Sequence, residues 1–237
     1  MRCVRFLGLA SVLLGLAAPA SASHLDFFSD GGFFSFTDNI TGPVTTVQTG
    51  DPGNILGGER EVTMDFISGD GMISSGIVGV SVGPGAVGEK SGSSLLFNNS
   101  VSSLGRLTLK YDGIGSEGLG GADFNSAWDA ITVTFAGVQG HGNLSVAVED
   151  TASHVGVFSQ AVNSAGTLIY PFANPAYSGV DFSSINRVTL TLDTTEAASD
   201  FSISNVAREA SLLPEPGTGV LLLVGLAGVG LGMRRRV

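Results

Sequence analysis

Residues 131–135 are Ile-Thr-Val-Thr-Phe, and their apolar side chains occupy every second position. The same alternation recurs in Leu-Ser-Val-Ala-Val at 144–148 and in Val-Thr-Leu-Thr-Leu at 188–192. A period of two is typical of a strand that buries one face and turns the other outward. These three segments therefore predict β-strands that share a common core.

The alternating pattern continues toward the amino end of the chain, at 62–66, 78–82 and 107–111. Turns rich in Gly, Asn, Asp and Ser separate the segments, as at 68–71 and 137–143, and almost no stretch has a helical period. Many short strands at near-regular spacing are typical of sandwiches. We predict an all-β fold, an antiparallel β-sandwich of jelly-roll type with about a dozen strands in two sheets.

Large aromatic side chains give a first estimate of the core. Trp128 precedes a strictly alternating strand, and we expect it in the core because tryptophan is usually largely buried. A group of phenylalanines near the start of the domain is expected to pack a first strand against the core: Phe27, Phe28, Phe33, Phe34 and Phe36.

The amino end has the three parts of a secretory signal peptide. Arg2 and Arg5 precede an apolar stretch at 6–16, and the small residues Ala20-Ser-Ala22 follow it. We predict a signal peptide over 1–22 that signal peptidase removes after Ala22, with cleavage after Ala20 as the alternative. The single cysteine of the chain lies in this segment. The exported protein should therefore contain no disulfide and no thiolate metal site.

The carboxyl end combines three features in order. Pro214-Glu215-Pro216 is followed by an uncharged apolar run at 217–233 and then by Arg234, Arg235 and Arg236. A helix over the run would be about 25 Å long, close to the roughly 30 Å of a bilayer's hydrocarbon core. The arginines favour a cytoplasmic end, so we predict one transmembrane helix that holds the preceding domain outside. A buried core helix is the alternative, but it would have to accommodate the three arginines.

This ordered triplet resembles the PEP-CTERM sorting signal of Gram-negative bacteria, and the resemblance covers residues 214–237. It implies processing near Pro214, Glu215 and Pro216 by an exosortase, an integral-membrane cysteine transpeptidase. It also implies a producer that makes extracellular polysaccharide. We expect the protein to be exported, anchored transiently in the inner membrane, and then placed at the cell surface or outside the cell. The β-sandwich should span 23–206, with a linker at 207–213.

Charge excludes one class of partner. Between the two terminal segments the chain has 6 basic and 20 acidic residues, a net charge of −14. Such a surface repels nucleic acid and anionic lipid, so nucleic-acid binding is excluded.

Two enzyme-like motifs fail on their context. Gly79-Val-Ser81-Val-Gly83 matches the nucleophile elbow of hydrolases, but Gly83-Pro84-Gly85 prevents the helix that must follow the serine. The segment 113–118 matches the dinucleotide-binding pattern G-x-G-x-x-G, but Gly120-Gly121 breaks the helix which that site requires. The three histidines, His24, His141 and His154, offer no clear general base. We predict no enzymatic activity.

Three carboxylates suggest a metal site. Glu59 and Glu61 lie early in the domain and Asp200 begins its last strand. The run 193–206 is loosely similar to the closing strand of galactose-binding-like jelly rolls, the fold of many carbohydrate-binding modules. That resemblance implies a structural Ca²⁺ where the early and late strands meet. Solvated carboxylates at strand ends are the alternative, and beyond Ca²⁺ no cofactor is predicted.

One aromatic residue is a candidate for sugar binding. Tyr177 lies in a loop flanked by proline, at 171–178, and we predict that its ring is exposed. An exposed ring can stack on the apolar C–H face of a sugar while polar neighbours bind its hydroxyl groups.

Two functions follow from these observations. The first is a non-enzymatic surface or extracellular matrix protein associated with exopolysaccharide, in a structural or adhesive role. The alternative is a carbohydrate-binding module, with or without Ca²⁺, that recognises the producer's own polysaccharide. A sandwich fold by itself does not separate them.

Overall fold

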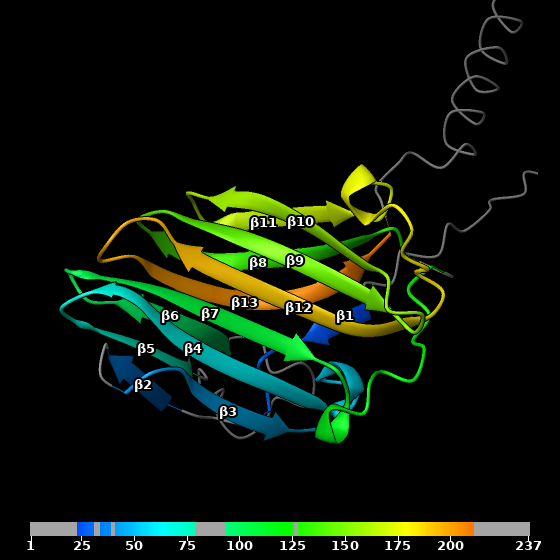
Figure 1. Cartoon of the computed structure of the whole chain (residues 1–237), viewed down its shortest axis with the longest axis horizontal. Helices are drawn as coiled ribbons and strands as arrows, with labels where there is room; N and C mark the ends of the chain where they lie inside the picture. Colours follow the sequence, from blue (N-terminus) through cyan, green and yellow to red (C-terminus); the bar gives the residue numbers. More distant parts are fainter. Residues whose placement is uncertain (1–22, 31–33, 39–40, 79–92, 126–127, 211–237) are drawn as a thin grey trace, which may run out of the picture.

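The computed structural model describes residues 23–30, 34–38, 41–78, 93–125 and 128–210. These residues form thirteen β-strands and three short 3₁₀ turns (Figure 1). The strands are arranged in two sheets, and each neighbouring pair is antiparallel. The predicted all-β antiparallel sandwich is confirmed.

The larger sheet has seven strands in the order β11-β8-β13-β6-β5-β2, with β1 paired to β13 beside this path. Its strands are β1 (Ser23–Asp26), β2 (Phe34–Asp38), β5 (Met72–Val78), β6 (Ser94–Asn99), β8 (Ala130–Gln139), β11 (Gly166–Pro171) and β13 (Asp200–Glu209). Its two edges are therefore β11 and β2.

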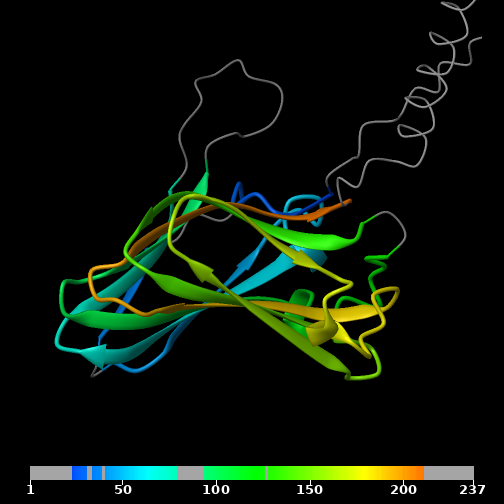
Figure 2. The same cartoon turned by 90° about the horizontal axis from the view of Figure 1, so that it is seen from above.

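The smaller sheet has six strands in the order β10-β9-β12-β7-β4-β3. They are β3 (Val44–Thr49), β4 (Glu59–Gly69), β7 (Ser103–Tyr111), β9 (Gly142–Asp150), β10 (Val155–Val162) and β12 (Ile185–Thr194). The 3₁₀ turns are η1 (Leu56–Gly58), η2 (Ile114–Ser116) and η3 (Pro175–Tyr177). The two sheets form the two layers of the sandwich, which Figures 1 and 2 show from directions at right angles.

The core lies between the layers and is built from the alternating segments. In β12, Val188, Leu190 and Leu192 are each at most 1% exposed, and they pair with the buried Val148, Val146 and Leu144 of β9, respectively. In β8 the buried residues are Ile131, Val133 and Phe135. The period of two in the sequence thus corresponds to the inward and outward sides of the strands.

Several expectations need adjustment. The last strand continues to Glu209, beyond the predicted domain end at Val206. Phe28 is fully buried as expected, but Phe36 is 54% exposed, so the prediction that it packs into the core is wrong. Trp128 is only partly buried, and the Arg208 guanidinium lies 4.0 Å from the centre of its ring. In the part of the chain that the structure describes, no helix is long and apolar enough to cross a membrane, and the predicted span at 217–233 lies outside that part.

Candidate binding face on the seven-stranded sheet

The three carboxylates predicted to share a cation do not come together. Glu59 begins β4, close to η1, where its Oε2 accepts a hydrogen bond from the Gly115 N–H. Glu61 forms an ion pair of 2.9 Å with Lys110. Asp200 lies at the opposite end of the sandwich. Its neighbour Ser199 accepts a hydrogen bond from the Asn99 N–H, and Asn99 precedes the turn that leads to Ser103. Ser103 pairs with Gly69, the last residue of β4.

The separation follows from the length of β4. Its eleven residues extend about 33 Å at roughly 3.3 Å per residue, and Glu59 is at the end away from Asp200. Among the described residues, no group of three or more His, Cys, Asp or Glu side chains could hold a metal ion.

Tyr177 is buried, so the expectation of an exposed ring is wrong. Its side chain is 2% exposed, and its hydroxyl donates a hydrogen bond to the Val146 carbonyl. The ring also packs edge-on against Phe158 and Phe182. The turn η3 folds back under β10, and this contact with the core is what covers the tyrosine. Burial raises its pKa.

Several predicted residues lie outside the described part of the chain. They are the cleavage residues Ala20 and Ala22, the sorting motif Pro214, Glu215 and Pro216, the arginines Arg234, Arg235 and Arg236, and the motif serine Ser81. The roles given to the cleavage, sorting and arginine residues remain predictions, and so does the absence of a catalytic role for Ser81.

The segment that matches the dinucleotide pattern forms a loop around a 3₁₀ turn. Ile114–Ser116 makes up η2, and the glycines at 113, 115 and 118 all have positive φ angles. Because a helix needs negative φ, this loop cannot present a helix N-terminus to a phosphate.

The histidines form simple pairs. His24 bonds to Asn205, His141 to Asn163, and His154 Nδ1 lies 2.9 Å from the Asp150 carboxylate. The Ser199 hydroxyl donates to the backbone carbonyl of His141 and not to its ring. Within the described residues these ring contacts therefore pair no imidazole with a serine hydroxyl, the arrangement in which a base activates a nucleophile.

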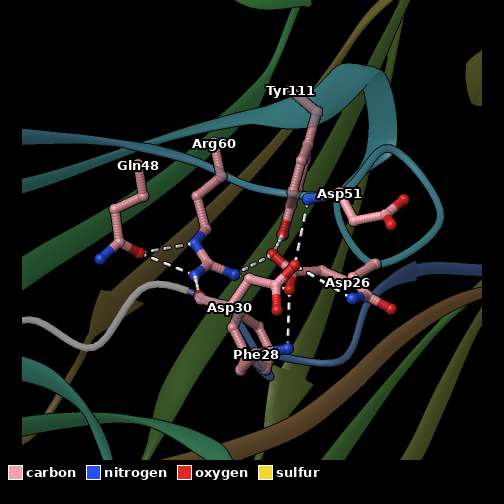
Figure 3. A network of polar contacts seen from close by, with 8 residues as sticks. Asp26, Phe28, Asp30, Gln48, Asp51, Arg60 and Tyr111 are labelled. Atoms are coloured by element: carbon pink, nitrogen blue, oxygen red, sulfur yellow. Dashed lines mark hydrogen bonds and ion pairs between the residues drawn. The ribbon is translucent and has the colours of Figure 1, made fainter.

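A buried polar network connects the two sheets at one end of the sandwich (Figure 3). The Arg60 guanidinium donates to both carboxylate oxygens of Asp26 and to the Gln48 side-chain oxygen. The Tyr111 hydroxyl and the Phe28 N–H also donate to Asp26. Burial raises the pKa of Asp26, and the charge of Arg60 and these hydrogen bonds offset part of that rise. Arg60 and Asp26 are 0% exposed, which makes the network a structural element that a ligand does not reach.

The outer face of the seven-stranded sheet carries a different polar arrangement. Strand pairing aligns five residues in one row across five strands. Leu95, Phe97 and Phe201 are buried inward, so the residues that alternate with them point outward. The members of the row, from β8 to β2, are Gln139, Asp200, Asn98, Ser74 and Phe36. We call these five residues the outer row.

A hollow of about 230 Å³ lies at the β8 end of the outer row. Its lining residues are the polar Asn98, Gln139, Asp200 and Ser202 and the apolar Leu96, Val138, Phe201 and Gly137. The Phe201 side chain itself points into the core. The register between β8 and β13 shifts next to Ser202, which pairs with Gly137. A Cβ atom added to Gly137 would lie 3.7 Å from the Ser202 Cβ. Because glycine has no side chain, the space beside Ser202 stays open, and Gly137 therefore contributes to the hollow.

Hydrogen-bonding groups in the hollow are available to a ligand. Among the described residues, the side-chain amides of Asn98 and Gln139 have no hydrogen-bond partner. Each amide offers two donors and an acceptor. Burial raises the pKa of the Asp200 carboxyl, and a hydrogen bond from the Asn99 backbone N–H offsets part of that rise. The hollow thus presents donors, acceptors and one acidic group, with no Lys or Arg in its lining.

Phe36 extends this polar surface with an aromatic ring. It lies three strands from Asp200 in the outer row, a distance of about 14 Å at roughly 4.8 Å between strands. Met72, 51% exposed, lies two residue pairs along the strands on the same face. The outer row thus combines two amides, one hydroxyl and one carboxylate with an exposed aromatic ring.

In the sequence, Asp200 was predicted to be a metal ligand and Phe36 a core residue, and no other member of the outer row was singled out. Asn98 alternates with Leu95 and Phe97, which places it outward, and that signal was readable in the sequence. The alignment of Asn98 with Phe36 could not be predicted from the sequence. Their strands, β6 and β2, lie on opposite sides of β5, and only the folded structure sets the register of these three strands.

No family model matches the chain, and no curated protein matches it. Solved structures give distant likenesses. The family 11 carbohydrate-binding module of a Clostridium thermocellum cellulosomal cellulase is 14% identical, with 82% of this chain and 97% of the module covered and a TM-score of 0.39. A module described as TmCBM61, solved with β-1,4-galactotriose, is 11% identical, with 56% and 80% covered and a TM-score of 0.33. An exo-β-agarase is 12% identical, with 62% and 23% covered and a TM-score of 0.38.

At these values the comparisons assign no function to the chain. The fold and the outer row define an antiparallel β-sandwich with a polar, aromatic-flanked face on one sheet.

Proposed function

We propose that the β-sandwich is a non-catalytic domain that binds a polysaccharide across the outer face of its seven-stranded sheet. The observation that carries this proposal is the outer row, which places unpartnered amides and an exposed phenylalanine on one line. Amides bind sugar hydroxyls as both donors and acceptors, and an aromatic ring stacks on the apolar face of a sugar. The row extends across five strands, so it fits several linked sugars.

The chemistry of the face favours an uncharged polymer. Asp200 adds an acidic group to the hollow, and the domain as a whole has a net charge of −14. A polymer of uronic acids would approach this surface against electrostatic repulsion, whereas a neutral polymer meets none.

Affinity electrophoresis of the full chain in mild detergent tests this function. The gels contain either a soluble uncharged polysaccharide or a uronic acid polymer. We expect retardation by at least one uncharged polymer, and weaker retardation of Phe36→Ala and of Gly137→Val. Valine at 137 fills the hollow without removing a polar group, and the backbone there lies outside the left-handed region, so a side chain causes no strain.

Ile114→Ala is the matched control, because Ile114 is 63% exposed but lies in η2, away from the outer row. It should migrate as the unaltered protein does. Failure of every uncharged polymer to retard the chain would overturn the proposal, as would equal retardation of the two face variants and the control.

We further propose that the chain is exported and held at the inner membrane until an exosortase processes it. Pro214-Glu215-Pro216, the apolar run and the terminal arginines support this proposal, and so does the signal-peptide pattern at 1–22. The domain would then reach the cell surface or the extracellular matrix, where a polysaccharide ligand is present. The intact mass of protein recovered from the surface of producing cells tests the proposal. A mass without residues 1–22 and without most of 217–237 is expected, and a mass that retains 217–237 contradicts processing.

A further inference from the structure

The first and last strands of the sandwich meet, and this junction is where a Ca²⁺ ion is predicted from the sequence. β1 pairs with β13, and Asp26 at the end of β1 lies beside Val206. The Asp26 carboxylate is buried and points toward the smaller sheet, where Gln48 of β3 and Arg60 of β4 lie (Figure 3). Asp26 is therefore the carboxylate that a cation at this junction would bind.

Oxygen atoms surround the guanidinium of Arg60. Nη1 donates to Oδ1 and Oδ2 of Asp26, at 2.6 and 2.5 Å, and Nη2 donates to the backbone carbonyl of Asp30 at 2.6 Å. Nε and Nη2 both donate to Oε1 of Gln48, at 2.9 and 2.7 Å. A guanidinium has five N–H donors, and these five bonds use all of them. A carboxylate, an amide oxygen and a backbone carbonyl are also the ligands that Ca²⁺ takes in proteins, so the site has the ligand chemistry of a metal site.

A metal ion does not fit among these oxygens while Arg60 is in place. Arg60 and Asp26 are 0% exposed, and Nη1 lies 2.5 Å from Oδ2. An ion at the carboxylate would have to displace the guanidinium and leave its charge buried without a partner, which is strongly destabilising. The guanidinium and a metal ion therefore exclude each other at this site.

The backbone at Phe28 is bent to fit the same ion pair. Its φ angle of 54° lies in the left-handed region, which a bulky residue rarely adopts. This conformation brings the Phe28 N–H to Oδ1 of Asp26 at 2.7 Å, and the ring lies 5.2 Å from Cζ of Arg60. Strained residues persist where their surroundings hold them in place, and here the contacts that do so include both members of the pair.

We propose that Arg60 takes the place of a structural metal ion, so that the sandwich holds its first strand by a cation of its own chain and does not depend on Ca²⁺. The oxygens of residues 26–30 and of β3 converge on one buried cation, which in this chain is the guanidinium. When a substitution removes the guanidinium, the same oxygens should bind Ca²⁺, with water molecules completing its roughly six to eight ligands. This inference is independent of polysaccharide binding.

Thermal unfolding of the full chain in mild detergent, followed by circular dichroism, tests it in excess EDTA and in millimolar CaCl₂. The unaltered chain should have the same midpoint in both solutions. Arg60→Thr should lower the midpoint in EDTA by about 6–20 °C, since it breaks a buried pair in a domain of this size. Threonine suits a strand, so the loss reflects the missing cation and not strand propensity. Ca²⁺ should raise the midpoint of this variant toward that of the unaltered chain, and the rise should grow with Ca²⁺ concentration, because an ion that binds only the folded state stabilises it by mass action.

Arg106→Thr is the matched control, because Arg106 and its partner Asp193 are 45% and 32% exposed. Its midpoint should not respond to Ca²⁺. Adding Asp26→Asn to Arg60→Thr should abolish the response, because it removes the charged ligand.

Three results would overturn the proposal. A Ca²⁺-dependent midpoint in the unaltered chain would show that a metal ion stabilises the fold with Arg60 in place. An Arg60→Thr variant that Ca²⁺ does not stabilise, including one that stays unfolded at every concentration, would show that these oxygens form no metal site. A Ca²⁺ response that Arg106→Thr shares, or that survives Asp26→Asn, would place the ion elsewhere.

Discussion

Arg60 Nη1 and Asp26 Oδ2 lie 2.5 Å apart, and both side chains are completely buried. Asp26 ends β1, which pairs with β13 of the larger sheet, whereas Arg60 lies in β4 of the smaller one. The ion pair therefore ties the two layers together, and Tyr111 and Gln48 complete its hydrogen bonds (Figure 3).

Replacing Arg60 by methionine should destabilise the fold strongly. The change leaves Asp26 buried without its counter-charge, and breaking a buried pair in this way typically costs about 3–5 kcal/mol. Urea unfolding measures the loss. Arg106→Met is the control, because Arg106 and its partner Asp193 are 45% and 32% exposed, and such pairs contribute about 0–1 kcal/mol. Equal losses in the two variants would contradict a structural role for the buried pair.

The Asp150 carboxylate should make the stability of the folded protein depend on pH. The Asp181 N–H, the His154 side chain and the N–H groups of His154 and Ala152 all bond to its carboxylate, and they lower its pKa from 3.8 to about 2. The unfolded chain takes up this proton near 3.8, before the folded protein does. The stabilisation is therefore complete above that pH and is lost as pH falls through about 2.

Thermal unfolding midpoints between neutral pH and pH 2 test this dependence. Asp150→Asn should be less stable than the unaltered protein at neutral pH, and the difference should shrink as the pH approaches 2. A difference that stays constant over this range would show that Asp150 does not act through its charge.

Tyr177 should contribute to stability and not to ligand binding. Tyr177→Phe removes the hydrogen bond to the Val146 carbonyl and keeps the buried ring, so we expect a loss of about 0.5–1.5 kcal/mol in the free energy of unfolding. Retardation by polysaccharide should be unchanged. If a folded Tyr177→Phe variant bound the polysaccharide more weakly, this would show that the Tyr177 hydroxyl contributes to ligand binding.

Asp200 should determine the discrimination between neutral and acidic polymers. Asp200→Asn keeps a hydrogen-bonding group in the hollow but removes the negative charge. We expect a gain in the binding of uronic acid polymers relative to uncharged ones, and a smaller effect of salt on that ratio, because salt screens the charge that the variant lacks. An unchanged ratio would mean that Asp200 does not contact the ligand.

The strands could be predicted because their signal is local. In Leu107–Tyr111 or Val188–Leu192, each residue's inward or outward direction depends only on its neighbours in the chain. The exposure of Phe36 and the burial of Tyr177 depend on contacts with residues far away in sequence. Phe36 lies on the outer face of a sheet edge, and Tyr177 packs under β10. Residue type favoured a buried Phe36, and the loop flanked by proline favoured an exposed Tyr177.

The candidate site was harder to predict for the same reason. Asp200 was singled out, but its predicted partners Glu59 and Glu61 lie at the far end of β4. Its actual neighbours, Asn98 and Gln139, come from strands that are distant in the chain and are brought together by register. The buried pair of Asp26 and Arg60 was not predicted, because the two residues are 34 positions apart in the chain.

Isothermal titration calorimetry tests the central claim most directly, that the outer row is a polysaccharide-binding face. The full chain is titrated with the uncharged polymer that retards it most, and compared with Asn98→Ala/Gln139→Ala and with Thr45→Ala/Val47→Ala on the outer face of the other sheet. Losing the two amides should weaken binding about fivefold or more, at roughly 0.5–1.5 kcal/mol for each hydrogen bond, while the second variant binds as the unaltered chain does. Equal affinity of all three proteins, or a loss confined to the Thr45/Val47 variant, would contradict the account.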